Sequence, residues 1–105
     1  MMSMQSSTSE SRLLTLRVVS MIREPFGVEC ESVGLTAIDT DAGKGGGAYD
    51  VHYGHADTVL AIKSGTVTAR RNGAVCLSFR CNGGFARVTG GNTVTVVTET
   101  VETVE

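Results

Sequence analysis

The apolar residues of this chain recur at every second position in short runs, and this alternation limits the possible folds more than any other feature. Leu14, Leu16 and Val18 show the pattern first, with polar residues between them. Successive side chains of a β-strand point to opposite faces, so this alternation predicts strands with one buried face. β-branched residues dominate the apolar set, and nothing in the sequence supports a long helix.

Turn-forming residues separate these runs at the spacing of short strands. The pair Asn72-Gly73 is the strongest hairpin signal, because both central residues of the tightest hairpin turns need a positive φ. Between the turns, the sequence predicts strands over residues 14–18, 26–31, 33–37, 58–62, 66–71, 74–81, 85–89 and 93–98. We expect roughly nine or ten short antiparallel strands that close into an all-β sandwich, since each has one face to bury.

Length and charge limit the classes of function. A chain of 105 residues is one small domain, which we place at residues 13–105 after a disordered polar N-terminal tail, residues 1–12. The formal net charge of −2 argues against nucleic acid or an anionic membrane as a direct partner. The apolar runs are only a few residues long, so we expect no segment to span a membrane.

The three cysteines, Cys30, Cys76 and Cys81, make an odd number and lack a zinc-ligand spacing. We expect free thiols packed in the core of a protein from a reducing compartment. No serine, cysteine or carboxylate pair comes with a second element that would hold a base beside it. We therefore predict no catalytic residue and no cofactor.

Both histidines of the chain lie in one segment, which runs from Tyr49 to Asp57. The candidate partner-binding residues of this segment are Tyr49, Asp50, His52, Tyr53, Gly54, His55, Ala56 and Asp57. A glycine-rich stretch over residues 39–47 precedes the segment, and we expect a solvated loop there because the ligand sets of phosphate and calcium loops are incomplete. Long loops on rigid β-scaffolds often carry function, so we expect binding at this end of the fold.

Four pieces of sequence occur in an order that resembles one family. They are Leu16-Arg17-Val18-Val19-Ser20 with Arg23-Glu24-Pro25-Phe26-Gly27-Val28-Glu29, Gly46-Gly47-Ala48-Tyr49 with Tyr53-Gly54-His55-Ala56, Leu60-Ala61-Ile62-Lys63-Ser64-Gly65, and Gly83-Gly84-Phe85-Ala86-Arg87-Val88 with Asn92 and Val94-Thr95-Val96-Val97. Their order and spacing resemble the N-terminal β-sandwich domain of the epsilon subunit of F-type ATP synthases, called delta in mitochondria. The resemblance covers residues 14–102.

The resemblance implies a non-catalytic subunit in the central stalk of a rotary proton-translocating ATP synthase. One sheet face would lie against the gamma subunit, and the segment from Tyr49 to Asp57 would rest on the membrane c-ring, with His55 positioning the turn and contacting the ring. A separate small stalk subunit is a further implied partner. The implied location is the cytoplasmic face of a bacterial inner membrane or the matrix side of the mitochondrial inner membrane, with membrane association only through the complex.

The chain departs from the family pattern in several places. Tyr53 stands where the family has a proline, and Asp50 stands where it has a glycine. Gly46 and Ala48 replace acidic residues of the loop. The chain also stops where the family's C-terminal helical hairpin would begin, so we expect the inhibition of ATP hydrolysis that this hairpin provides to be missing.

Two alternatives of other classes remain. One is a small cupin-like metal-binding β-barrel, because His52, His55 and Asp57 precede a strand and could together hold iron, manganese or zinc. Side chains three apart on one strand point to opposite faces, however, and no histidine follows His55. The other alternative is a free-standing β-sandwich interaction module.

Two sets of substitutions follow from the preferred interpretation. Replacing His55 or enlarging Gly54 should loosen the coupling of ATP turnover to proton movement without unfolding the domain. Replacing Phe85 or Val96 by aspartate should unfold it, because we expect each site to bury an unpaired charge.

Overall fold

The alternating segments form ten β-strands in the computed structural model, which describes residues 12–38 and 47–104. The strands are β1 (Leu14–Val19), β2 (Phe26–Cys30), β3 (Ser32–Ala37), β4 (Gly47–His52), β5 (Thr58–Ile62), β6 (Gly65–Arg71), β7 (Ala74–Cys81), β8 (Gly84–Thr89), β9 (Thr93–Val97) and β10 (Val101–Thr103). Within these two ranges there is no helix long and apolar enough to cross a membrane. The predicted tail, except Arg12, and the predicted loop, except Gly47, lie outside the described residues.

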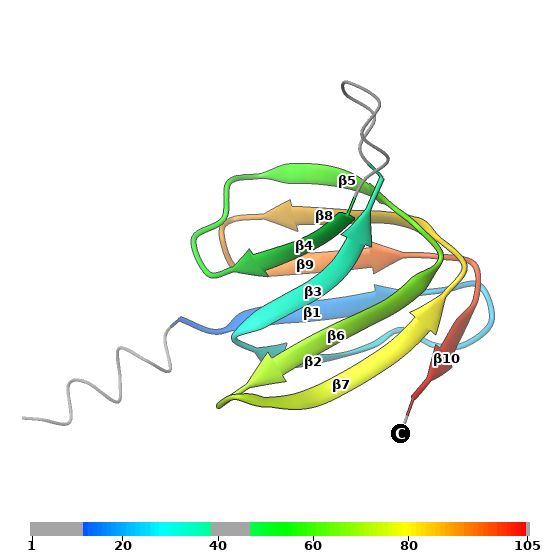
Figure 1. Ribbon diagram of the computed structural model, residues 1–105, viewed down its shortest axis with the longest axis horizontal. Coiled ribbons are helices and arrows are strands. Elements are labelled where there is room, and N and C mark those ends of the chain that lie inside the picture. Colours follow the sequence, from blue (N-terminus) through cyan, green and yellow to red (C-terminus); the bar gives the residue numbers. More distant parts are fainter. Residues whose placement is uncertain (1–11, 39–46, 105) are drawn as a thin grey trace, which may run out of the picture.

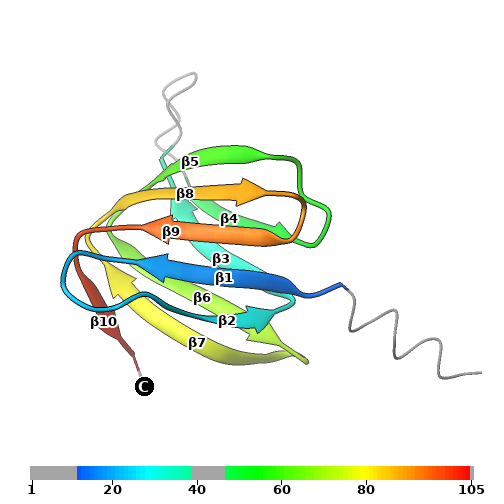
Figure 2. The ribbon, with the colours of Figure 1, turned by 180° about the vertical axis from the view of Figure 1, so that it is seen from behind.

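The strands form one continuous sheet that curls into two layers (Figures 1 and 2). The first layer, which faces the viewer in Figure 1, contains β10, β7, β6, β3 and β4. The second layer, which faces the viewer in Figure 2, contains β5, β8, β9, β1 and β2. The sheet folds at β3, which pairs with β4 along one edge and with β6 and then β5 along the other. The predicted all-β sandwich is confirmed.

The strands pair antiparallel with one exception, since β1 runs parallel to β9. This pair joins the β1–β2 hairpin to the β8–β9 hairpin. Its register places Leu16 beside Val94 and Val18 beside Val96, and all four side chains are fully buried. Alternation marks the buried face of a strand but not the direction of its neighbour, so the sequence could not indicate the parallel pair.

The core fills the space between the two layers with alternate side chains from both. Its fully buried large members include Leu14, Leu16, Ile62 and Phe79. The rings of Phe79 on β7 and Phe26 on β2 form a T-shaped pair, with the ring centroids 6.0 Å apart and the planes at 80°. This contact joins the two layers across the side opposite the fold at β3, in the geometry that aromatic pairs favour.

The eight strand predictions are confirmed to within a residue or two at their ends, but two strands escaped them. β4 covers residues that we expected to be loop, and only Tyr49 and Val51 of its six residues turn toward the core. It is an edge strand that pairs only with β3. Its two inward side chains are too few to give a clear alternating pattern in the sequence. β10 is only three residues long and pairs with the end of β7.

The hairpin between β6 and β7 has the predicted backbone, with φ of +56° at Asn72 and +78° at Gly73. The expectation of three core cysteines is correct for Cys30 and Cys81 and wrong for Cys76. A bulge in the β6–β7 pairing leaves Cys76 without a partner residue and exposes its side chain. Burial raises the pKa of the Cys30 thiol to about 11.

The expectation that Phe85 is a core residue is wrong, because Ala86 and Val88 are the buried residues of β8 and Phe85 faces outward with 45% of its surface exposed. Val96 is 0% exposed, as expected. We therefore predict that Val96→Asp unfolds the domain, because it would bury an unpaired carboxylate. Phe85→Asp should remain folded. Circular dichroism during heating distinguishes the two, and unfolding of both variants would contradict the observed face assignment of β8.

A second prediction concerns Gly84, whose φ is +130° and whose added Cβ would collide with the carbonyl oxygen of Val97. Gly84→Ala should lower the free energy of unfolding by ~1–3 kcal/mol, the usual cost of a strained backbone conformation. Gly47→Ala is the matched control, because a Cβ there meets no atom within 4 Å. Denaturant titration of both variants measures the difference, and equal stability would refute the predicted collision.

Candidate functional site

The candidate segment begins on β4, whose side chains alternate between the two faces of the first layer. Tyr49 is half-buried and packs against the core, and Val51 is fully buried. Asp50 and His52 are exposed on the outer face. The strand therefore sends the predicted binding residues in two directions.

A tight turn follows β4 and reverses the chain toward β5. The amide N–H of His55 donates to the carbonyl oxygen of His52, with 3.2 Å between nitrogen and oxygen. Gly54 is the third residue of this turn, and its φ of +88° is the value that a type II turn requires there. Tyr53 is the second residue, where proline is favoured but not needed. The substitution of tyrosine for the family's proline therefore leaves the turn intact and places a 47% exposed aromatic ring at its tip.

The imidazole of His55 holds this turn from within. Its Nδ1 lies 2.8 Å from the carbonyl oxygen of Ala56, which can only accept, so Nδ1 carries a proton. Its Nε2 lies 3.1 Å from the hydroxyl of Tyr49, and in the neutral ring Nε2 accepts that hydroxyl proton. The centroids of the two rings lie 5.8 Å apart, and the ring planes are inclined at 55°. Both ring nitrogens are thus bound within the segment itself.

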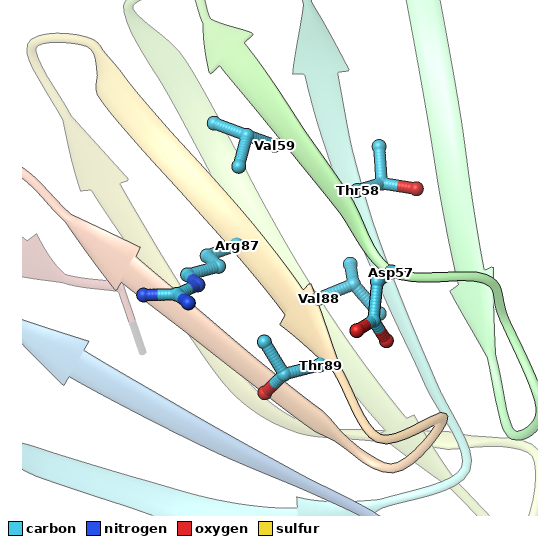
Figure 3. Close-up of a pocket in the computed structure, with 6 residues that line it drawn as sticks. All are labelled: Asp57, Thr58, Val59, Arg87, Val88 and Thr89. Carbon is cyan, nitrogen blue, oxygen red and sulfur yellow. The ribbon is translucent and has the colours of Figure 1, made fainter.

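Two further hydrogen bonds fasten the turn to the hairpin between β8 and β9. The amide N–H of Gly54 donates to the carbonyl oxygen of Gly91 at 2.7 Å, and the amide N–H of Gly90 donates to Oδ1 of Asp57 at 2.9 Å. A Cβ on Gly91 would lie 3.4 Å from the α-carbon of Gly54, so the two turns are in van der Waals contact range. Figure 3 shows Asp57 where β5 begins, beside the end of β8. The segment therefore links both layers at one end of the sandwich.

The structure brings five of the predicted residues into this fastened turn: Tyr49, Gly54, His55, Ala56 and Asp57. Tyr53 stands at its tip, while Asp50 and His52 lie on the outer face of the first layer. Sequence reasoning missed Gly90 and Gly91, which it recognised only as a turn between two strands. Their contacts join residues more than thirty positions apart, and no local pattern indicates such a contact.

The metal-binding alternative finds no support in this geometry. Among residues 12–38 and 47–104, no three side chains of histidine, cysteine, aspartate or glutamate are gathered closely enough to hold a metal ion. Both ring nitrogens of His55 are bound to Tyr49 and Ala56, and the Asp57 carboxylate accepts from Gly90.

The fold is an all-β sandwich whose fastened turn carries an exposed aromatic side chain, Tyr53, at its tip. Residues 13–104 match the family model of the beta-sandwich domain of the ATP synthase delta/epsilon chain, and the chain belongs to this family. A comparison with curated protein sequences finds no significant match.

Two similar solved structures share the fold. One chain of the Euglena gracilis mitochondrial ATP synthase, in a structure of OSCP, F1 and c-ring, aligns with a TM-score of 0.68 and 19% identity over 88% of this chain. One chain of the Tetrahymena thermophila mitochondrial ATP synthase, in a structure of the central stalk and c-ring, aligns with a TM-score of 0.57 and 15% identity over 85% of this chain. The alignments span 54% and 63% of those longer chains.

The hydrogen bond from Tyr49 to His55 gives a direct test of the turn. Tyr49→Phe removes the donor to Nε2 and should lower the free energy of unfolding by ~0.5–1.5 kcal/mol, the usual net value of one such bond. It should also shift the His55 ring away from a single tautomer, which nitrogen NMR of the imidazole detects. Tyr53→Phe is the matched control and should change neither quantity, because its ring is at the exposed tip. Identical spectra for the two variants would contradict the assigned bond.

Proposed function

We propose that this chain is a non-catalytic central-stalk subunit of a rotary proton-translocating ATP synthase, in which it links the gamma shaft to the membrane c-ring and supports coupling of proton flow to ATP synthesis. Membership of the delta/epsilon family carries the proposal. The two similar structures are of assemblies that include a c-ring, and one is of a central stalk. The proposed location is the cytoplasmic face of a bacterial inner membrane or the matrix side of a mitochondrial inner membrane, reached only through the complex.

Rigidity is the property that such a role demands, because a link that yields under torque loses coupling. The turn after β4 meets this demand through three contacts outside its own backbone bond. These are the bonds of Gly54 to Gly91, of Asp57 to Gly90 and of His55 to Tyr49. They fix the turn against two different strand pairs, so it cannot tilt without breaking at least one of them.

We propose a division of labour within the candidate segment. Tyr53 at the tip and the neighbouring Asp50 and His52 are exposed and form the contact with the c-ring. Tyrosine suits this position because it brings a large contact area with few rotatable bonds. His55 has both ring nitrogens bound within the segment and therefore acts as a positioning residue.

The proposal predicts that Tyr53→Ala weakens coupling while the domain stays folded. Truncating an anchoring aromatic side chain costs ~2 kcal/mol of binding, which is on the order of a 30-fold loss of affinity. In inverted membrane vesicles, synthase carrying this variant should hydrolyse ATP but pump fewer protons for each ATP. His55→Ala should have a similar effect through the loosened turn.

Val75→Ala is the matched control, because Val75 is 50% exposed on β7, outside the candidate segment. Its coupling should equal that of the unaltered protein. If all three variants pump equally well for each ATP, the turn is not part of the ring contact. If the unaltered chain never joins a synthase, the proposed function itself is wrong.

A further inference from the structure

Two Asn-Gly pairs occur in the chain, and the structure holds them in opposite ways. Asn72-Gly73 forms the tip of the hairpin between β6 and β7, and Asn82-Gly83 lies between β7 and β8. An asparagine before glycine is prone to lose its side-chain amide, because glycine has no side chain to block its own main-chain nitrogen. The same reaction can therefore be compared at two places in one molecule.

The reaction needs only the chain itself and water. The main-chain nitrogen of the glycine, after losing its proton, attacks Cγ of the asparagine and expels ammonia, which leaves a five-membered succinimide ring. Water then opens the ring. Cleavage of the bond between nitrogen and Cγ gives aspartate, whereas cleavage of the bond between nitrogen and the main-chain carbonyl carbon gives isoaspartate. The main chain of isoaspartate runs through Cγ and is one atom longer, so both the charge and the backbone change.

Asn82 is held by its side chain. Its Nδ2 donates to Oε1 of Glu99 at 3.4 Å, and its Oδ1 accepts from the amide N–H of Thr100 at 3.4 Å. The hydroxyl of Thr98, a residue that is 5% exposed, lies 3.1 Å from the same Oδ1 and 2.6 Å from the carbonyl oxygen of Gly83. The Cγ of Asn82 therefore cannot turn toward the next nitrogen until these bonds break.

Asn72 has a side chain without such restraints. Asn72 and Gly73 are both exposed, and in the part of the chain that the structure describes no hydrogen bond reaches the Asn72 carboxamide. Only its main-chain N–H is held, at 2.9 Å from Oε1 of Glu31. The carboxamide is therefore free to approach the Gly73 nitrogen once the backbone of the turn opens.

The pairing next to this tip favours such opening. The φ values of +56° at Asn72 and +78° at Gly73 belong to the closed two-residue turn, which the backbone must leave before the ring can form. The bulge at Cys76 interrupts the β6–β7 register near the tip, and β10 pairs with β7 only at residues 79–81, at its other end. A hairpin end of this kind opens locally at a lower free energy than the interior of a sheet.

We propose that Asn72 is a site of spontaneous deamidation, at which the folded chain converts to isoaspartate and aspartate while Asn82 is protected. The co-reactant is water, and no enzyme takes part. Because Ser32 pairs with His52 on one edge and with Arg70 on the other, the hairpin tip lies at the same end of the sandwich as the turn after β4 (Figure 1). The reaction therefore adds a negative charge to the end of the domain that carries the candidate segment.

Ageing of the purified full chain at mildly alkaline pH tests the site. Peptide mapping by mass spectrometry should show Asn72 converting at least ~10-fold faster than Asn82, because the bonds to the Asn82 side chain must break first. In denaturant the two rates should converge, since both pairs then have the same freedom. No conversion at Asn72, equal rates in the folded chain, or a ratio that persists in denaturant overturns the proposal.

The protection of Asn82 has its own test, in which Thr98→Val removes the hydroxyl and keeps the size of the side chain. Conversion at Asn82 should become at least ~3-fold faster, while the rate at Asn72 stays the same. Thr98→Ser is the matched control, because it keeps the hydroxyl, and Asn82 should remain slow in it. Circular dichroism establishes that both variants are folded. If Asn82 converts no faster in folded Thr98→Val, these bonds do not protect it and the proposed contrast is wrong.

Isoaspartate should distort the turn, because its longer main chain has to fit between Arg71 and Ala74, the paired ends of β6 and β7. Aspartate adds the same charge with an ordinary main chain, and Asp-Gly suits this type of turn. The isoaspartate form of the full chain, separated after ageing, should therefore unfold at a lower temperature than the unaltered chain. Asn72→Asp is the matched control and should unfold close to the unaltered chain. Equal unfolding temperatures for all three would refute the distortion.

Discussion

The fold depends on one strand that serves two layers. β3 gives one edge to β4 and divides the other, so that Gly34 pairs with Thr68 of β6 and Ala37 pairs with Ile62 of β5. Because a single backbone supplies hydrogen bonds to both layers, the sheet must curl at this strand, and its inward side chains then lie between the layers. Val33 and Leu35 of β3 are among the buried residues that result. The Phe26–Phe79 contact closes the opposite side. A domain of this size buries only about two-thirds of its unfolded surface, so such closure on both sides matters for its stability.

The same curl determines where a binding turn can be rigid. β4 in the first layer and β5 in the second layer both pair with β3. The connection between them is short, so the chain crosses from one layer to the other within a few residues. The turn has no strand partner of its own and gains its order from the β8–β9 hairpin, through Gly90 and Gly91. Both contacts come from glycines with a positive φ, +64° at Gly90 and +76° at Gly91, which other residues rarely adopt. Fastening to a distant hairpin lets an exposed segment be stiff without being buried.

Alternation predicted the strands that bury apolar side chains along their whole length. It missed β4 and β10, which each have only one buried side chain. Alternation in β1 or β9 is an unmistakable signal, because every second side chain is apolar and buried. β4 has only Tyr49 and Val51 on its inner face, and its glycine and charged residues resemble a loop. The candidate segment was found because it concentrates both histidines and follows a family pattern. Its internal bonding was not predictable, since the partners of Gly54 and Asp57 come from a hairpin far along the chain. Phe85 shows the same limit: an aromatic residue in a strand does not reveal its face unless the register is known.

The β8–β9 hairpin connects the turn after β4 to the second layer. Its turn holds the segment after β4, while its strands carry Arg87, Thr95, Phe85 and Val97 on their outer face. A force applied at Tyr53 would pass through the Gly54–Gly91 bond into this hairpin and from there into β1, which pairs with β9. Under the proposed function, this bracing would let a small β-sandwich resist force at one exposed turn without enlarging its core.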